Sequence, residues 1–174
     1  MGNIIIAGGG LVNKGAQAMT LICVCELKKR FPGHRLQLLV WDDSPDAQKC
    51  HAPYDLELLQ IPPLKFAGAA GNPLKRALYA LRYGRSFTDT DHIYRNTDFL
   101  VDISGYALGS NWSEKVCNDY LDNIEHALAY GIPVFLLPYR GRSSRPAVWQ
   151  PKWHRYISVL WRSYPDPPAD RPAE

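Results

Sequence analysis

Residues 3–15 read NIIIAGGGLVNKG, an apolar run that ends in three consecutive glycines and leads into a polar stretch. A short apolar run of this kind is typical of a buried strand, and the glycines let the chain turn sharply where the strand ends. The sequence then predicts a helix over residues 15–30, which Pro32 and Gly33 stop, and a second strand over residues 35–41. Strand, helix and strand in this order predict a parallel, right-handed β–α–β unit.

The second half of the chain repeats this order. It predicts a strand over residues 99–103, a glycine-bearing loop over 104–110, a helix that ends near residue 130 and a strand over 134–137. Between the two units the sequence predicts a short strand over residues 56–61, a loop over 62–72, a helix over 73–83 and further helical turns over 86–95. The fold class is therefore α/β, a Rossmann-like parallel sheet flanked by helices.

The first predicted helix contains apolar residues at regular intervals. Ala18, Leu21, Ile22 and Cys25 recur along the helix at helical spacing. Such a stripe is typical of the buried side of an amphipathic helix. This spacing therefore supports the helix predicted over residues 15–30.

Composition limits the class of protein. The chain has 174 residues, 46% hydrophobic and 21% charged, with a net charge of +3, too small to indicate nucleic acid as a partner. No apolar window is long enough for a membrane span and no signal peptide precedes the first strand, so we expect a cytoplasmic protein. Neither the cysteines nor the histidines show metal-ligand spacing, so we expect no metal site. Residues 1–138 are expected to form the domain, and residues 139–174 an Arg-, Pro- and Trp-rich tail, largely irregular or disordered.

The expected binding site lies where the strands end. Ligands of open parallel sheets sit at the carboxyl ends of the strands, and a glycine loop at a helix N-terminus favours an anion. The candidate substrate-binding residues are Asn13, Lys14, Gly15 and Gln17 from the first loop, and Asp102, Ser104, Gly105 and Tyr106 from the later one. No catalytic acid or base is singled out. The glycines could instead serve only to form tight turns, and this alternative stays open. For Asp102, a hydrogen bond to the amides of a neighbouring loop is as consistent with the sequence as a role in ligand binding.

A dinucleotide site is an alternative. The fingerprint G-x-G-x-x-G, started at Gly8, requires glycine at the position of Asn13. Asp42 or Asp43, at the end of the second strand, has the place of the ribose-binding acid. The match is therefore partial, and an NAD-type domain or a non-catalytic binding module stays open.

Two segments resemble a known family. Residues 10–19 (GLVNKGAQAM) resemble the N-x-G-(Asp or Ala)-x-A motif of the polysaccharide pyruvyl transferases, and residues 98–108 (DFLVDISGYAL) resemble that family's later strand and glycine loop. The resemblance covers residues 1–138. After Pro138 the chain departs from the family, which usually continues with Gln-Ser-x-Gly-Pro-Phe.

The resemblance implies a specific activity. Family members have two Rossmann-like halves, similar to the GT-B glycosyltransferases, and transfer pyruvate from phosphoenolpyruvate to a saccharide as a ketal, generally without a metal or nucleotide cofactor. Much of the family's phosphoenolpyruvate site lies in the second half. The resemblance therefore implies the N-terminal half of such a transferase, apparently truncated and incomplete or inactive alone. The acceptor sugar and a homo-oligomeric state stay open.

Overall fold

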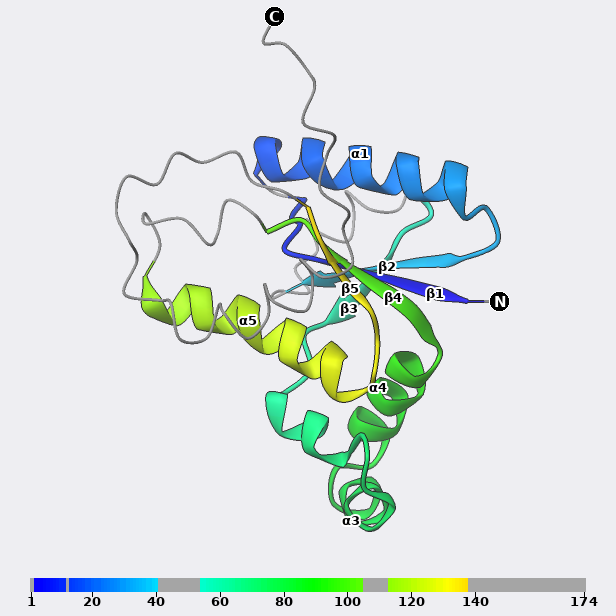
Figure 1. Cartoon of the computed structure of the whole chain (residues 1–174), viewed down its shortest axis with the longest axis vertical. Coiled ribbons are helices and arrows are strands. Elements are labelled where there is room, and N and C mark those ends of the chain that lie inside the picture. The colour runs from blue at the N-terminus through cyan, green and yellow to red at the C-terminus, as the bar shows by residue number, and fades with distance from the viewer. Residues whose placement is uncertain (1, 12, 41–53, 105–112, 138–174) are drawn as a thin grey trace, which may run out of the picture. The chain divides into compact units, whose positions relative to one another are not determined.

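The computed structural model describes residues 2–11, 13–40, 54–104 and 113–137, and these residues form an α/β fold (Figure 1). The sheet consists of β1 (Asn3–Ala7), β2 (Arg35–Val40), β3 (Glu57–Gln60), β4 (Thr97–Asp102) and β5 (Val134–Leu136). The helices are α1 (Lys14–Arg30), the 3-10 helix η2 (Leu64–Ala69), α3 (Pro73–Tyr83), α4 (Arg85–Arg95) and α5 (Glu114–Ala129). The expected tail at 139–174 lies outside the described residues, as do Asp42 and Asp43.

The five strands form one parallel sheet in the order β3-β2-β1-β4-β5. The chain first adds strands on one side of β1, and then returns to add β4 and β5 on the other side. The predicted Rossmann-like class is therefore confirmed. The strand order reverses between β1 and β4, and this topological switch point is where open α/β sheets leave a crevice for a ligand.

Helices cover both faces of the sheet, with α1 on one side and α5 on the other (Figure 1). Under α1, buried residues of β1, β2 and β4 pack in one cluster with Cys23, Val24 and Leu27. In α5, Leu121, Ile124 and Ala127 are buried. Gly131 follows α5 with a φ of +74°, a left-handed conformation that ends the helix as the sequence predicts. No helix in the described part is both long and apolar enough to cross a membrane.

The four apolar residues that recur at helical spacing do not form the buried face of α1. Ala18 and Cys25 are exposed, Ile22 is 65% exposed, and Leu21 is only half-buried. The face on the sheet instead carries Thr20 together with the buried Cys23, Val24 and Leu27. Because α1 has apolar residues around most of its circumference, periodicity does not determine its rotation. The rotation follows from the hydrogen bonds of Thr20, described below.

The predicted loop at 62–72 contains η2, in which Phe66 and Ala69 are buried. Phe66 packs edge-on against Phe87 of α4, with ring centroids 5.2 Å apart, so a tertiary contact stabilises a helix too short to show a period. The predicted strand at 56–61 and helix at 73–83 are confirmed.

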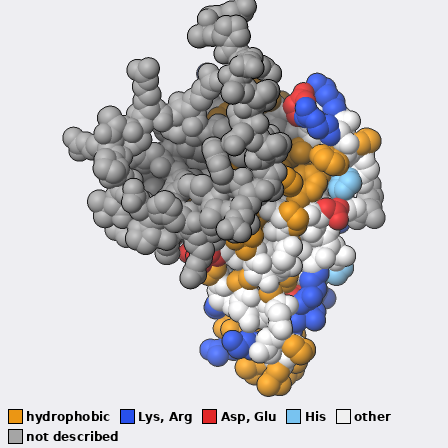
Figure 2. All heavy atoms as spheres, in the orientation of Figure 1, with side chains coloured by type: hydrophobic (Ala, Val, Ile, Leu, Met, Phe, Trp, Pro, Cys, Tyr) orange, Lys and Arg blue, Asp and Glu red, His pale blue; other side chains and the backbone are white. Residues whose placement is uncertain are grey.

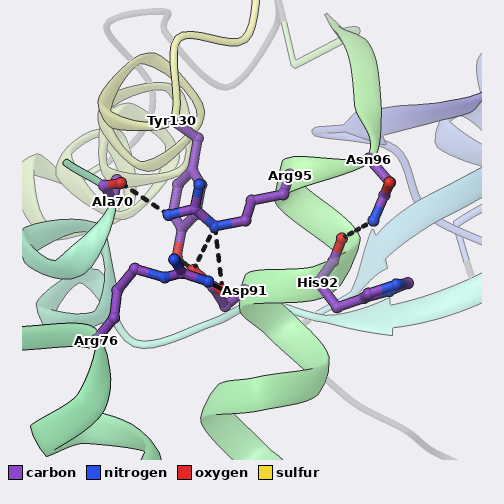
Figure 3. Close-up of polar contacts among 7 residues, drawn as sticks. All are labelled: Ala70, Arg76, Asp91, His92, Arg95, Asn96 and Tyr130. Carbon is purple, nitrogen blue, oxygen red and sulfur yellow. Dashed lines mark hydrogen bonds and ion pairs between the residues drawn. The ribbon is translucent and has the colours of Figure 1, made fainter. Parts of the chain in front are cut away.

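A buried carboxylate links α3 and α4 to Tyr130, the residue that directly follows α5 (Figure 3). Asp91 of α4 accepts hydrogen bonds from Arg76 of α3 at 2.8 Å, from Arg95 at 3.1 Å and from the Tyr130 hydroxyl at 3.1 Å. Arg95 also donates to the Ala70 carbonyl at 2.9 Å. Burial opposes ionisation of Asp91, but the hydrogen bonds from Arg76, Arg95 and Tyr130 outweigh it and lower its pKa. The cluster is thus a structural ion-pair network that connects α3, α4 and the end of α5.

Candidate functional site

The candidate site lies at the switch point between β1 and β4. Ala7 and Asp102, the last residues of these strands, are register partners. The Ile103 amide continues the pairing by donating to the Ala7 carbonyl at 2.9 Å. The glycine loop after β1 and the segment around Ser104 therefore leave the sheet side by side. In sheets of this kind, ligands bind between two such loops.

Gly8 brings the two segments into direct contact. Its φ is +72°, and a Cβ added there would lie 2.2 Å from the Ser104 Cβ and 2.5 Å from the Ser104 amide nitrogen. Only glycine combines this backbone conformation with so close an approach. Gly8 is absent from the predicted site residues, although the glycine run that contains it was the reason for placing a site here.

Thr20 holds the glycine loop against α1. Its fully buried hydroxyl accepts a hydrogen bond from the Gly10 amide at 3.1 Å and donates to the Ala16 carbonyl at 2.8 Å. A Cβ on Gly9 would lie 2.6 Å from the same hydroxyl oxygen. Thr20 is absent from the predicted site residues. A lone hydroxyl among the apolar residues of a helix that follows a glycine loop could have indicated a hydrogen bond to that loop.

Asn13 caps α1. Its side-chain oxygen accepts hydrogen bonds from the Gly15 amide at 2.9 Å and the Ala16 amide at 3.4 Å. These are two of the amides that an anion at this helix N-terminus would use. Lys14 and Gly15 are exposed and Gln17 is half-buried, so their side of the loop is accessible to a ligand.

Asp102 is the buried acid of the site. One carboxylate oxygen, Oδ1, accepts a hydrogen bond from the Ser104 amide at 2.7 Å and another from the Ser104 hydroxyl. The other oxygen, Oδ2, is buried and has no hydrogen-bond partner in the described part of the chain. Burial raises the pKa of Asp102 above its ordinary value, and the hydrogen bonds from Ser104 only partly oppose this.

An unpartnered buried carboxyl oxygen carries a free-energy cost that a ligand can remove. The ionised form accepts a hydrogen bond from a ligand hydroxyl, and the protonated form donates one to a ligand oxygen. Since Ser104 holds Oδ1, the oxygen left for either contact, as far as the described residues show, is Oδ2. The carboxyl is therefore oriented by its neighbour.

The predicted residues fall into two groups. Asp102 and Ser104 contact each other, and Ser104 also borders the first loop through Gly8. Asn13 contacts Gly15, but within the described residues no hydrogen bond or ion pair links the side chains of Asn13, Lys14 or Gln17 to Asp102 or Ser104. Gly105 and Tyr106 lie outside the described residues. In the same described ranges, no group of three His, Cys, Asp or Glu side chains is arranged to hold a metal ion.

Comparison with known proteins adds no family: no family model matches the chain, and no curated protein matches it. The resemblance to the pyruvyl transferases therefore rests on the two motifs alone. What the structure adds is the position of these motifs at the switch point of a Rossmann-like sheet.

Proposed function

We propose that this chain forms the N-terminal half of a polysaccharide pyruvyl transferase-like protein, which transfers pyruvate from phosphoenolpyruvate to a saccharide hydroxyl as a ketal. The observation that carries the proposal is the position of the two family-like segments: the first begins two residues after Gly8, which lies against Ser104 of the second. These segments are far apart in sequence, but the glycine loop that precedes the first one approaches Ser104 of the second through Gly8. Two motifs that serve one ligand need this proximity.

The polar groups fit a hydroxyl-rich ligand on this half. Asp102 Oδ2 is suited to a hydrogen bond with a sugar hydroxyl. Lys14 supplies one exposed positive charge at the rim, while Asn13 occupies two of the helix amides. This half therefore suits the acceptor saccharide better than the highly charged donor, whose family site lies largely in the second half.

The cap also weighs against the dinucleotide alternative. A bound dinucleotide places its pyrophosphate on the free amides of the first helix N-terminus. Here the Asn13 side chain holds the Gly15 and Ala16 amides, at the position where the fingerprint requires glycine. A pyrophosphate would have to displace this cap.

The test is saccharide-dependent release of phosphate from phosphoenolpyruvate, measured with nucleotide- and lipid-linked sugars as acceptors. The chain is compared with a version that carries a second Rossmann-like domain, because one wall of a cleft lacks the water exclusion and preorganised charges of a complete site. We expect turnover only in the two-domain version. The substitution Asp102→Asn should raise the KM for the acceptor about tenfold, in line with the loss of one hydrogen bond to a charged group.

Asp89→Asn is the matched control, because Asp89 is an exposed aspartate on α4, outside the site. It should leave KM and kcat unchanged. Turnover by this chain alone would contradict the proposal that activity needs the second domain. Micromolar binding of a nicotinamide dinucleotide, without release of phosphate from phosphoenolpyruvate, would favour the dinucleotide alternative.

A further inference from the structure

The outer face of α3 is an exposed apolar stripe. Leu74, Leu78 and Leu81 follow each other at helical spacing, so they lie on one side of the helix. They are 79%, 57% and 86% exposed, respectively. Single exposed leucines are common on protein surfaces, but three aligned on one helix face form a patch that calls for a partner.

The other face of α3 is held in place. Arg76 makes an ion pair with the buried Asp91 at 2.8 Å. Tyr79 and Tyr83 pack with Phe66 and Phe87 in a cluster of aromatic rings. Because these contacts determine the rotation of the helix, the leucines cannot turn inward and remain presented to their surroundings.

The surroundings of the stripe are cationic. Residues 58–88 contain no Asp or Glu, but they contain Lys65, Lys75, Arg76, Arg82 and Arg85. Arg76 is paired with Asp91, whereas no ion pair within the described residues involves the other four. Figure 2 shows hydrophobic side chains next to Lys and Arg side chains at the end of the molecule where Figure 1 places α3.

The cations lie where a lipid surface would use them. Lys75 directly follows Leu74 and Arg82 directly follows Leu81, so each lies about 100° around the helix from a leucine of the stripe. Lys and Arg at the edge of an apolar face keep their charges in water while their methylene stems stay in contact with apolar groups. An apolar face bordered by cations is typical of helices that lie in the interface of a membrane.

Charge complementarity decides between the occupants of this surface. In a pair of identical chains, the cations that border the stripe, Lys75 and Arg82, would meet the same two cations, and like charges would oppose the contact. An anionic bilayer instead offers phosphate groups to the cations and an acyl boundary to the leucines. We propose that α3 docks this chain on the surface of an anionic lipid bilayer, with the helix lying along the surface and the three leucines inserted. This inference does not depend on the proposed function.

Vesicle co-sedimentation of the full chain tests the inference. The vesicles contain either phosphatidylcholine alone or equal parts of phosphatidylcholine and phosphatidylglycerol. We expect sedimentation with the mixed vesicles, much less with the neutral ones, and a loss of binding at high salt. The triple substitution Leu74→Ser, Leu78→Ser and Leu81→Ser should abolish the binding.

Two further variants separate the apolar and charged contributions. Replacing Lys75 and Arg82 by glutamine should weaken binding to the mixed vesicles about 25-fold, because each cation near an anionic surface strengthens binding about fivefold. The matched control is Met19→Ser with Ile22→Ser, which removes two exposed apolar side chains from α1. This control should bind the vesicles like the unchanged chain.

The leucines are exposed, so their substitution should leave the circular dichroism and melting temperature unchanged. If the triple variant does not fold, Leu81→Ser alone is used, because Leu81 is the most exposed of the three. The inference is overturned if the unchanged chain does not sediment with mixed vesicles, or if the leucine variant binds as well as the control. It is also overturned if light scattering shows a dimer that the leucine variant converts to monomers while vesicles bind neither form.

Discussion

Replacing Gly8 by alanine should destabilise the protein far more than the same change at another glycine with the same backbone conformation. Gly8 and Gly131 have φ values of +72° and +74°. A Cβ on Gly8 would lie 2.2 Å from the Ser104 Cβ and 2.6 Å from its Cα, whereas a Cβ on Gly131 would meet nothing within 4 Å. The two substitutions therefore share the conformational penalty and differ in the steric one.

The expected magnitudes follow from these contacts. A left-handed conformation costs a residue with a side chain about 1 kcal/mol, which is the whole expected loss for Gly131→Ala. At Gly8 the ends of β1 and β4 must also separate by about 1 Å, because two of the neighbouring Ser104 atoms belong to the backbone, the third is a Cβ that the backbone fixes in place, and none can rotate away. Overpacking of this kind adds about 2–3 kcal/mol. We therefore expect Gly8→Ala to lower the free energy of unfolding by about 3–4 kcal/mol.

Urea unfolding followed by circular dichroism measures both free energies, and thermal unfolding should show decreases in Tm of about 10 °C for Gly8→Ala and about 3 °C for Gly131→Ala. Equal destabilisation by the two substitutions would refute the contact between the glycine loop and Ser104. In that case the site would have to be rebuilt without a direct contact between the two loops.

Three further predictions concern buried polar groups. Thr20→Val should cost about 1–3 kcal/mol in urea unfolding and speed up hydrogen exchange of the Gly10 amide, which loses its acceptor; unchanged exchange would argue against that hydrogen bond. Asp91→Asn should cost about 2–3 kcal/mol at neutral pH, less than a fully buried pair because its arginine partners are half-exposed. The pKa of Asp91 in the folded protein lies below its ordinary value of 3.8. The stabilisation by the ionised carboxylate is therefore present above about pH 4 and is lost as the pH falls through the folded pKa. In that pH range the difference in unfolding free energy between Asp91→Asn and the unchanged chain should shrink. Burial lowers the pKa of His126 from 6.5 to about 4. Its neutral ring therefore contributes stability above pH 6.5 that is lost as the pH falls toward 4. His126→Phe should remove up to about 3 kcal/mol of this pH dependence, and an unchanged pH profile of stability would contradict the burial of the neutral ring.

The fold was more predictable from the sequence than the site. Alternating strand and helix signals are local, and each β–α unit of a parallel sheet shows them within one short segment. The rotation of α1 is not local, because it depends on the hydrogen bond between Thr20 and Gly10. Likewise η2 forms because Phe66 packs on Phe87, a contact that no periodicity predicts.

The candidate site shows the same division. The sequence shows that polar residues follow the strands. It does not show that β1 pairs with β4, because this pairing depends on the order of strands in the sheet. Asn13 was expected to position a ligand, and the structure gives its side chain a capping role, which the preference of asparagine for this position explains. The site residues Gly105 and Tyr106 remain predictions.

The arrangement of Asp102 and Ser104 limits the chemistry available on this half of the site. Ser104 donates two hydrogen bonds to Oδ1, so it favours the ionised carboxylate while burial disfavours it. A ligand hydroxyl that donates to Oδ2 would add to the effect of Ser104 and lower the pKa of Asp102, whereas an anionic ligand would raise the pKa further. The direction of this shift on binding, followed by the carboxyl carbon signal of Asp102 in NMR titrations, therefore distinguishes a saccharide at this wall from phosphoenolpyruvate.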